Sequence, residues 1–333
     1  MNNAKSNRQG HIDVARAIGI ILVAFVHLYF DFTKIYIESF LMPLFFFISG
    51  YLFSPQHHKS FTSFFSNRFK RLMYPYFLWS IILFIFWNFL DDKEGSTLSN
   101  LKGIIYASGG KEYMEWGIML WFLPCIFVAE MIYFNVLKYG GRYSTLLVII
   151  IAIIGYYLSS WIIDYLPWSL NVSLVMMLFY HIGQKSKILF ANKKFNPLLY
   201  ILLIPSIALL IISSYLNGDV STYQGNFGNP ILYFLSGIGG LTFILLFSHV
   251  LRNFAVLRIT GKHTLFIFVS HLRIFTFFKI VQLYIFNIPI SSSLTSSIAY
   301  TVMAVALLVP ISMLINKKFS FLLQMPKSYS KAR

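Results

Sequence analysis

Charged residues are scarce in this chain of 333 residues, where Asp, Glu, Lys and Arg together make up 11%. A soluble protein carries about 25% of such residues, because they cover its surface. The chain is instead 57% hydrophobic and has a mean hydropathy of +0.69. These values exclude a soluble enzyme and a disordered chain.

Acidic residues are especially few, since 11 Asp and Glu stand against 27 Lys and Arg, a formal net charge of +16. In a membrane protein such an excess indicates orientation rather than nucleic-acid binding, so we expect no nucleic-acid partner. The single cysteine, Cys125, excludes an internal disulfide and has no neighbouring charge to activate a thiolate. No set of His, Asp or Glu repeats at metal-ligand spacing on one predicted helix, so we expect no metal.

Long apolar runs are what the sequence has instead. A bilayer core of about 30 Å takes roughly 20 apolar residues per helix. The sequence predicts ten such spans, at about 13–31, 35–54, 73–90, 117–136, 145–163, 167–183, 196–215, 230–251, 263–286 and 294–315. The fold expected is an all-α, polytopic integral membrane protein with a single domain over residues 1–333. The first run contains Arg16 and His27 and is followed by no small-residue cleavage site, so we expect that it is not a cleavable signal.

The basic residues test this topology. If the N-terminus is cytoplasmic, 20 of the 27 Lys and Arg fall in the inner segments. Basic residues stay preferentially on the cytoplasmic side of a membrane. The sequence therefore predicts a multi-pass cell-membrane protein with both termini cytoplasmic.

Three ionisable residues lie on one stripe of the first predicted span. Arg16 and His27 are 11 positions apart, which places them about 20° out of line and about 16 Å apart along a helix axis. Asp31 follows His27 at the i+4 position and can face its ring. Buried charge in a membrane is costly, so the set predicts a function. Taken singly, Arg16 could be a snorkelling anchor, His27 a core histidine and Asp31 a solvated carboxylate.

The same residues carry a resemblance to a known family. The stretch from Asp13 to His27, DVARAIGIILVAFVH, resembles the opening signature of the membrane-bound acyltransferase 3 family, a basic residue and a histidine separated by ten residues. The block MPLFFFISGYLF, which starts at Met42, is similar to the family's next block as found in sugar O-acetyltransferases. The segment RFKRLMYPY, from Arg68, is similar to its Arg-x-x-Arg segment. Some members place a His before the Met-Pro pair, where this chain has Leu41.

The resemblance implies transfer of an acyl group, usually acetyl from acetyl-CoA, to a hydroxyl of a cell-surface glycan or of its lipid-linked precursor. A sugar hydroxyl needs a base, and His27 suits that role near neutral pH. Asp31 could orient the His27 ring, as a triad carboxylate does. Arg16 completes the predicted catalytic set. The expected partners are acetyl-CoA, the glycan acceptor and membrane lipid, while the oligomeric state stays open.

The donor's phosphates need cations on the cytoplasmic side. Arg68 and Arg71 are the predicted ligands for them, because a guanidinium binds phosphate in a bidentate manner. Both residues could instead be topological anchors. Ser49, in the second block, and His271, in the pair Ser270-His271 that more weakly resembles a later part of the family's sequence, are further candidates for the donor site. Ser49 and Gly50 could equally form a close helix-packing pair.

Two charged residues and three glycines within the predicted spans leave other interpretations of their roles and of the function open. Glu130 and Arg273 are predicted to neutralise each other if their helices touch. Gly237, Gly239 and Gly240 could break the eighth span, as in a glycan transporter or flippase. A non-catalytic membrane partner of a polysaccharide synthase is a third possibility.

Overall fold

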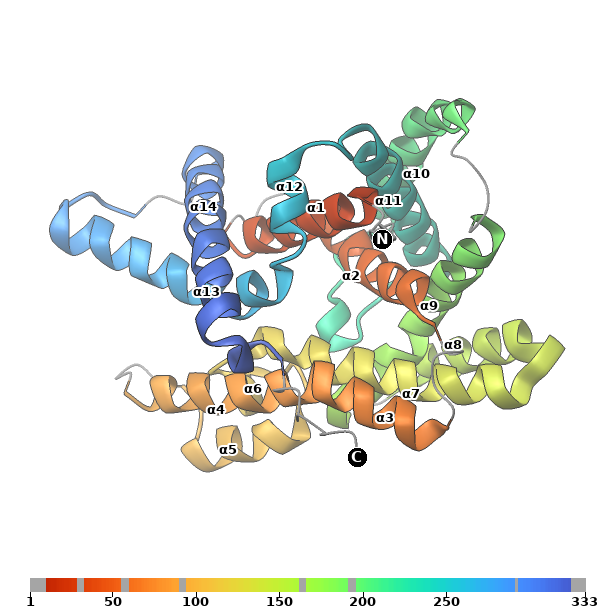
Figure 1. The fold of residues 1–333 in the computed structure, drawn as a ribbon, viewed down its shortest axis with the longest axis horizontal. Helices are drawn as coiled ribbons and strands as arrows, with labels where there is room; N and C mark the ends of the chain where they lie inside the picture. The colour runs from red at the N-terminus through yellow and green to blue at the C-terminus, as the bar shows by residue number, and fades with distance from the viewer. Residues whose placement is uncertain are drawn as a thin grey trace, which may run out of the picture. The chain divides into compact units, whose positions relative to one another are not determined.

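The computed structural model describes residues 10–28, 33–54, 60–89, 94–161, 166–190, 196–290 and 293–324, which are almost entirely helical (Figure 1). The α-helices are α1 (Gly10–Val26), α2 (Thr33–Leu52), α3 (Phe61–Arg68), α4 (Tyr74–Asn88), α5 (Thr97–Tyr106), α6 (Lys111–Met114), α7 (Phe122–Gly140), α8 (Ser144–Trp161), α9 (Leu170–Phe190), α10 (Leu203–Asn217), α11 (Pro230–Val250), α12 (Ala255–Thr260), α13 (Thr264–Ile280) and α14 (Leu294–Lys318). An isolated β-bridge joins Ser221 and Asn226. The predicted all-α class is confirmed.

Two compact units divide the chain. The first holds the described residues of Met1–Ile48, Phe190–Val220 and Gly228–Ser312, and the second holds those of Ser49–Leu189, Ser221–Phe227 and Met313–Arg333. We call them unit 1 and unit 2. Helices α2 and α14 each run from one unit into the other.

In unit 1, α1 packs against α11, α12 and α13, and α10 lies along α11 (Figure 1). A Cβ on Gly239 of α11 would lie 2.7 Å from the Leu210 backbone nitrogen of α10, so a glycine is needed for this close approach. Asn229 caps α11 by accepting from the backbone N–H groups of Ile231 and Leu232. Because α11 continues unbroken through its glycines to Val250, the break expected of a transporter helix does not occur there.

In unit 2, α3 continues through a π-helical turn, Phe69–Met73, into α4. This differs from the predicted inner loop before a span at 73–90. Phe64 of α3 stacks on Phe134 of α7 with ring centroids 4.5 Å apart, and Ser60 caps the helix. Aromatic packing therefore extends the helix toward its N-terminus. Helices α5 and α6 pack on each other between the predicted spans at 73–90 and 117–136.

Among the residues that the structure describes, seven helical segments are long and apolar enough to cross a membrane. They are Thr33–Leu52, Phe61–Asn88, Ile118–Trp161, Pro197–Asn217, Pro230–Val250, Thr264–Ile285 and Leu294–Lys318. The second segment extends past the predicted bounds, and Ile118–Trp161 covers two predicted spans. Two more predicted spans fall on α1, whose 17 residues reach about 26 Å, and on α9, whose second half is polar. The chain is thus a multi-pass membrane protein, with seven spans supported where ten were predicted.

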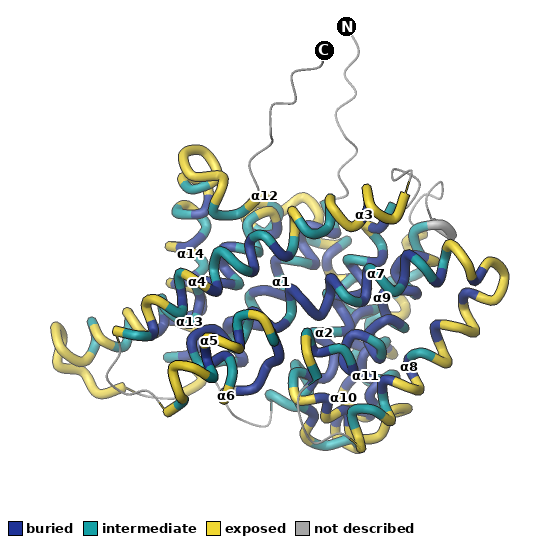
Figure 2. The backbone as a smooth tube through the Cα atoms, turned by 90° about the horizontal axis from the view of Figure 1, so that it is seen from below, coloured by how far each residue is buried: buried dark blue, intermediate teal, exposed yellow. Residues whose placement is uncertain are grey.

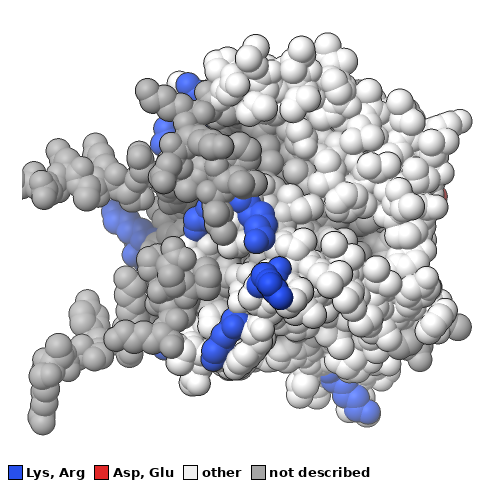
Figure 3. All heavy atoms as spheres, turned by 90° about the vertical axis from the view of Figure 1, so that its right-hand side faces the viewer, with Lys and Arg blue, Asp and Glu red and all other residues white. Residues whose placement is uncertain are grey.

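The surface has the character of one that faces lipid. On α8, exposed apolar side chains recur every three or four residues, at Leu146, Ile149, Ile150, Ile153, Ile154 and Tyr157. A soluble protein rarely exposes so continuous an apolar stripe. Figure 3 shows one face on which Lys and Arg are few among uncharged residues. By contrast, α1 is buried over most of its length (Figure 2).

Candidate active site

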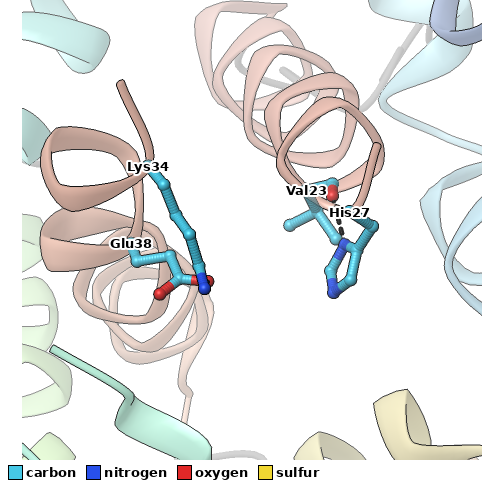
Figure 4. Close-up of polar contacts among 4 residues, drawn as sticks. All are labelled: Val23, His27, Lys34 and Glu38. Atoms are coloured by element: carbon cyan, nitrogen blue, oxygen red, sulfur yellow. Dashed lines mark hydrogen bonds and ion pairs between the residues drawn. The ribbon is translucent and has the colours of Figure 1, made fainter. Parts of the chain in front are cut away.

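His27 lies directly after the last residue of α1. Its Nδ1 is 2.5 Å from the carbonyl oxygen of Val23, one helical turn earlier (Figure 4). The side chain is partly buried. Because a carbonyl oxygen only accepts, Nδ1 carries the proton, and Nε2 of the neutral ring holds the lone pair. The predicted orienting residue, Asp31, lies outside the described residues, and the recorded contact at Nδ1 is the Val23 carbonyl.

His271 of α13 is a ring neighbour of His27, with ring centroids 5.3 Å apart and planes tilted by 60°. It is fully buried. Its Nδ1 lies 3.1 Å from the Ile267 carbonyl and 2.8 Å from the Phe268 carbonyl. Its Nε2 has no hydrogen-bond partner among the described residues. A buried polar atom without a partner costs about 1–3 kcal/mol, so this nitrogen marks a position that a ligand can satisfy.

The two histidines share one protonation pattern. In each ring Nδ1 donates to backbone carbonyl oxygens, which leaves Nε2 as the basic nitrogen. The pair therefore presents two neutral proton acceptors within one part of unit 1. Such an arrangement can remove a proton from one hydroxyl and hold another.

Charged side chains at the start of α2 lie near this pair. Lys34 Nζ is 3.8 Å from Glu38 Oε1, and both side chains are partly exposed (Figure 4). The charge of Lys34 acts on the His27 ring, and that of Asp219 acts on Glu38. The sequence reasoning did not single out these three residues, because charges near the predicted outer ends of spans look solvated.

Arg16 occupies α1 as predicted, 11 residues before His27, and its side chain is partly exposed. The helix therefore keeps the two about 16 Å apart along its axis. Arg16 is thus separated from the His27 end of α1 and is too far along the axis to donate a hydrogen bond there.

The predicted phosphate ligands lie in unit 2. Arg68 Nε is 3.2 Å from Glu130 Oε2, and the Arg68 guanidinium lies 5.4 Å from the centroid of the Phe64 ring. Tyr180 donates to Glu130 Oε1 at 3.3 Å. The predicted ion pair of Glu130 with Arg273 is wrong, because the ion-pair partner of Glu130 is Arg68. Arg71 is exposed. Of the two arginines, Arg71 is therefore the better placed for an incoming anion.

Ser49 is partly buried on α2, next to a very close helix contact. A Cβ on Gly50 would lie 1.9 Å from the Tyr180 carbonyl oxygen of α9. The packing explanation of the Ser49–Gly50 pair thus has direct support. Across the described residues, no three His, Cys, Asp or Glu side chains come close enough together to hold a metal ion.

Comparison with known proteins gives one result. No curated protein and no solved structure matches the chain. A family model described as "Acyltransferase domain", that of acyltransferase family 3, matches residues 10–317 and so covers both units. It takes in α1 and α13, the two helices that carry the histidine pair. The chain therefore belongs to the acyltransferase 3 family.

Proposed function

We propose that this protein is an O-acyltransferase, which moves an acetyl group from acetyl-CoA to a hydroxyl of a cell-surface glycan or of its lipid-linked precursor. Family membership implies acyl transfer. The single structural observation that carries the proposal is the pair of histidines, with ring centroids 5.3 Å apart, in which Nδ1 of each ring contacts a backbone carbonyl and the buried Nε2 of His271 has no hydrogen-bond partner among the described residues. The acceptor class comes from the resemblance of the second block to sugar O-acetyltransferases.

In the proposed reaction His27 is the general base. Its Nε2 takes the proton of the sugar hydroxyl while that oxygen attacks the thioester carbonyl. The resulting tetrahedral intermediate collapses, and the carbon–sulfur bond breaks with its electron pair going to sulfur. The His27 imidazolium returns its proton to the thiolate. The products are the sugar ester and coenzyme A, and the histidine ends in its starting state.

His271 supports this chemistry as a positioning residue. Its buried Nε2 can accept a hydrogen bond from the acceptor or from a bound water. We propose that it holds the acceptor beside His27. Arg16, Asp31 and Ser49 remain proposed members of the site, Arg16 through charge at the inner end of α1 and Asp31 through the His27 ring.

The proposed setting is the cell membrane, with ten spans and both termini cytoplasmic. The asymmetry of the basic residues supports this orientation. Acetyl-CoA is cytoplasmic, so the donor would enter from the inner side. The match of one family model across both units supports a single functional domain.

The test is acetyl transfer by the purified full-length protein in detergent. Release of coenzyme A is measured with acetyl-CoA, with and without glycan fragments. His27→Asn keeps a side-chain donor toward the Val23 carbonyl but has no base, so we expect a rate loss of about 100- to 10,000-fold. His263→Asn, which alters a histidine bonded to Ser312, is the matched control.

Two outcomes would contradict the proposal. Wild-type transfer by His27→Asn would remove His27 as the base. Absence of glycan-dependent coenzyme A release from the wild type would favour a non-catalytic partner or a transporter. Movement of a lipid-linked glycan across vesicles by that same preparation would identify the transporter.

A further inference from the structure

A second group of polar side chains lies at the opposite end of α1 from His27. It consists of His11, His249, Arg252 and Arg258, which we call the basic cluster. The His11 and His249 ring centroids are 5.7 Å apart. Arg252 Nη1 lies 2.9 Å from His249 Nδ1. Three chain segments therefore bring these groups together within unit 1: the start of α1, the end of α11 with the following turn, and α12.

Gly10 lets these segments approach closely. A Cβ at this position would lie 3.0 Å from the Arg252 carbonyl oxygen and 3.3 Å from Arg258 Nε. Arg258 Nε is buried and has no hydrogen-bond partner among the described residues. A guanidinium N–H without a partner is an incomplete site for an acceptor.

The charges of the basic cluster are of one sign. The positive charge of Arg252 acts on His11, and Asp13 is the carboxylate that acts on it in the opposite sense. The Asp13 side chain is itself buried. Two guanidinium groups carry the positive charge of the cluster and stand against one nearby carboxylate, while the two imidazoles can add hydrogen bonds, so an anion would find net positive charge and several donors.

We propose that the basic cluster binds the phosphate groups of the acyl donor. The inference rests on the proposed function, which supplies a donor with phosphates. Arginine suits this ligand because its planar fork donates two parallel hydrogen bonds to phosphate. His11 and His27 are 16 residues apart, so a straight helix separates them by about 24 Å. A ligand with phosphates at one end and a thioester at the end of a long arm matches that separation.

The structure favours the basic cluster over Arg68 for this role. Arg68 already has a carboxyl group beside it, because its Nε lies 3.2 Å from Glu130 Oε2. Arg252 and Arg258 have no ion pair of that kind in the described part of the chain. A merely topological set of charges would satisfy the positive-inside rule without converging on one point.

The experiment measures binding of coenzyme A to the full-length protein in detergent by calorimetry. We expect Arg252→Gln and Arg258→Gln each to weaken affinity about tenfold, with a smaller effect at high salt. Arg252→Lys keeps the charge but loses the planar fork of donors, so its affinity for coenzyme A should lie between those of the wild type and Arg252→Gln. The matched control is Arg142→Gln, an exposed arginine of unit 2 whose guanidinium lies 4.8 Å from the Tyr143 ring centroid. Arg71→Gln serves as the rival site.

The other possible results would overturn either the inference or the proposed function. Unchanged affinity in both cluster variants, with a loss in Arg71→Gln, overturns the inference and leaves the proposed function intact. Unchanged coenzyme A affinity together with weaker association with phosphatidylglycerol nanodiscs would assign the cluster to a lipid headgroup and also overturn it. If the wild type does not bind coenzyme A, the proposed function fails. Inorganic pyrophosphate is then the probe, and equal affinity of wild type and cluster variants would overturn the phosphate site as well.

Discussion

The buried ion pair of Arg68 and Glu130 allows a quantitative prediction. Its atoms are 3.2 Å apart, and the two side chains are 17% and 4% exposed. At an effective dielectric constant of about 20, unit charges at this separation attract by about 5 kcal/mol. Removal of one partner also leaves the other charge buried, at a typical cost of about 3–5 kcal/mol. Because Arg68 is partly exposed, we expect Glu130→Gln to lower the free energy of unfolding by about 3 kcal/mol.

A double variant distinguishes the net contribution of the ion pair from the cost of leaving one of its charges buried without a partner. Arg68→Met combined with Glu130→Met removes both charges, and we expect a stability within about 1 kcal/mol of wild type. The assay is denaturant-induced unfolding of the full-length protein in detergent, followed by circular dichroism. The Lys34–Glu38 pair is the control, since its atoms are 3.8 Å apart and its side chains are 36% and 28% exposed. Glu38→Gln should cost less than about 1 kcal/mol.

A cost below about 1 kcal/mol for Glu130→Gln would refute the reasoning, because it would show that water screens the pair. A double variant as unstable as the single one would refute it in another way, by placing the stability in packing rather than charge. Coenzyme A binding by the double variant then tests the site. Retained affinity is expected, because the pair holds α3 against α7 and leaves the donor to other residues.

Two further predictions concern packing. Gly50→Ala should lower stability by about 3 kcal/mol or more, because its Cβ would lie 1.9 Å from the Tyr180 carbonyl oxygen, whereas Gly117→Ala meets a movable Leu83 side chain at 3.2 Å. Equal melting temperatures for the two variants would contradict this. Cys125 is fully buried, so maleimide should label it only as the protein unfolds; rapid labelling of the native protein would show that the core around it opens.

The helices were largely predictable from the sequence. Apolar runs that end in turn or capping residues fix the elements locally, as at 230–251, where Asn229 and Pro230 begin α11. Errors arose where local signals were weak. The segment at 61–72 carries charges that suggest a loop, and it is helical because Phe64 packs on Phe134. Tertiary contact decided that element.

Which side chains contact one another was harder to predict from the sequence. His271 could be named from a short block, but its approach to His27 depends on how α1 packs against α13. Glu130 was matched with Arg273 because both lay within predicted spans, while Arg68 was assigned to a loop. Once α3 extends through Arg68, that residue reaches the same buried region as Glu130. The prediction of ion pairs from the depth of residues in the membrane therefore fails when a helix begins before its apolar run.

The state of the proposed base follows from a contact at the end of its helix. His27 directly follows Val26, the last residue of α1, and its ring Nδ1 lies 2.5 Å from the carbonyl oxygen of Val23, four positions earlier. Because a carbonyl oxygen only accepts, this contact places the proton on Nδ1 and leaves Nε2 as the basic nitrogen. The ring can reach this carbonyl because residues four positions apart lie on the same face of a helix. The tautomer proposed for the base therefore depends on a contact with its own helix and not on a residue of another helix.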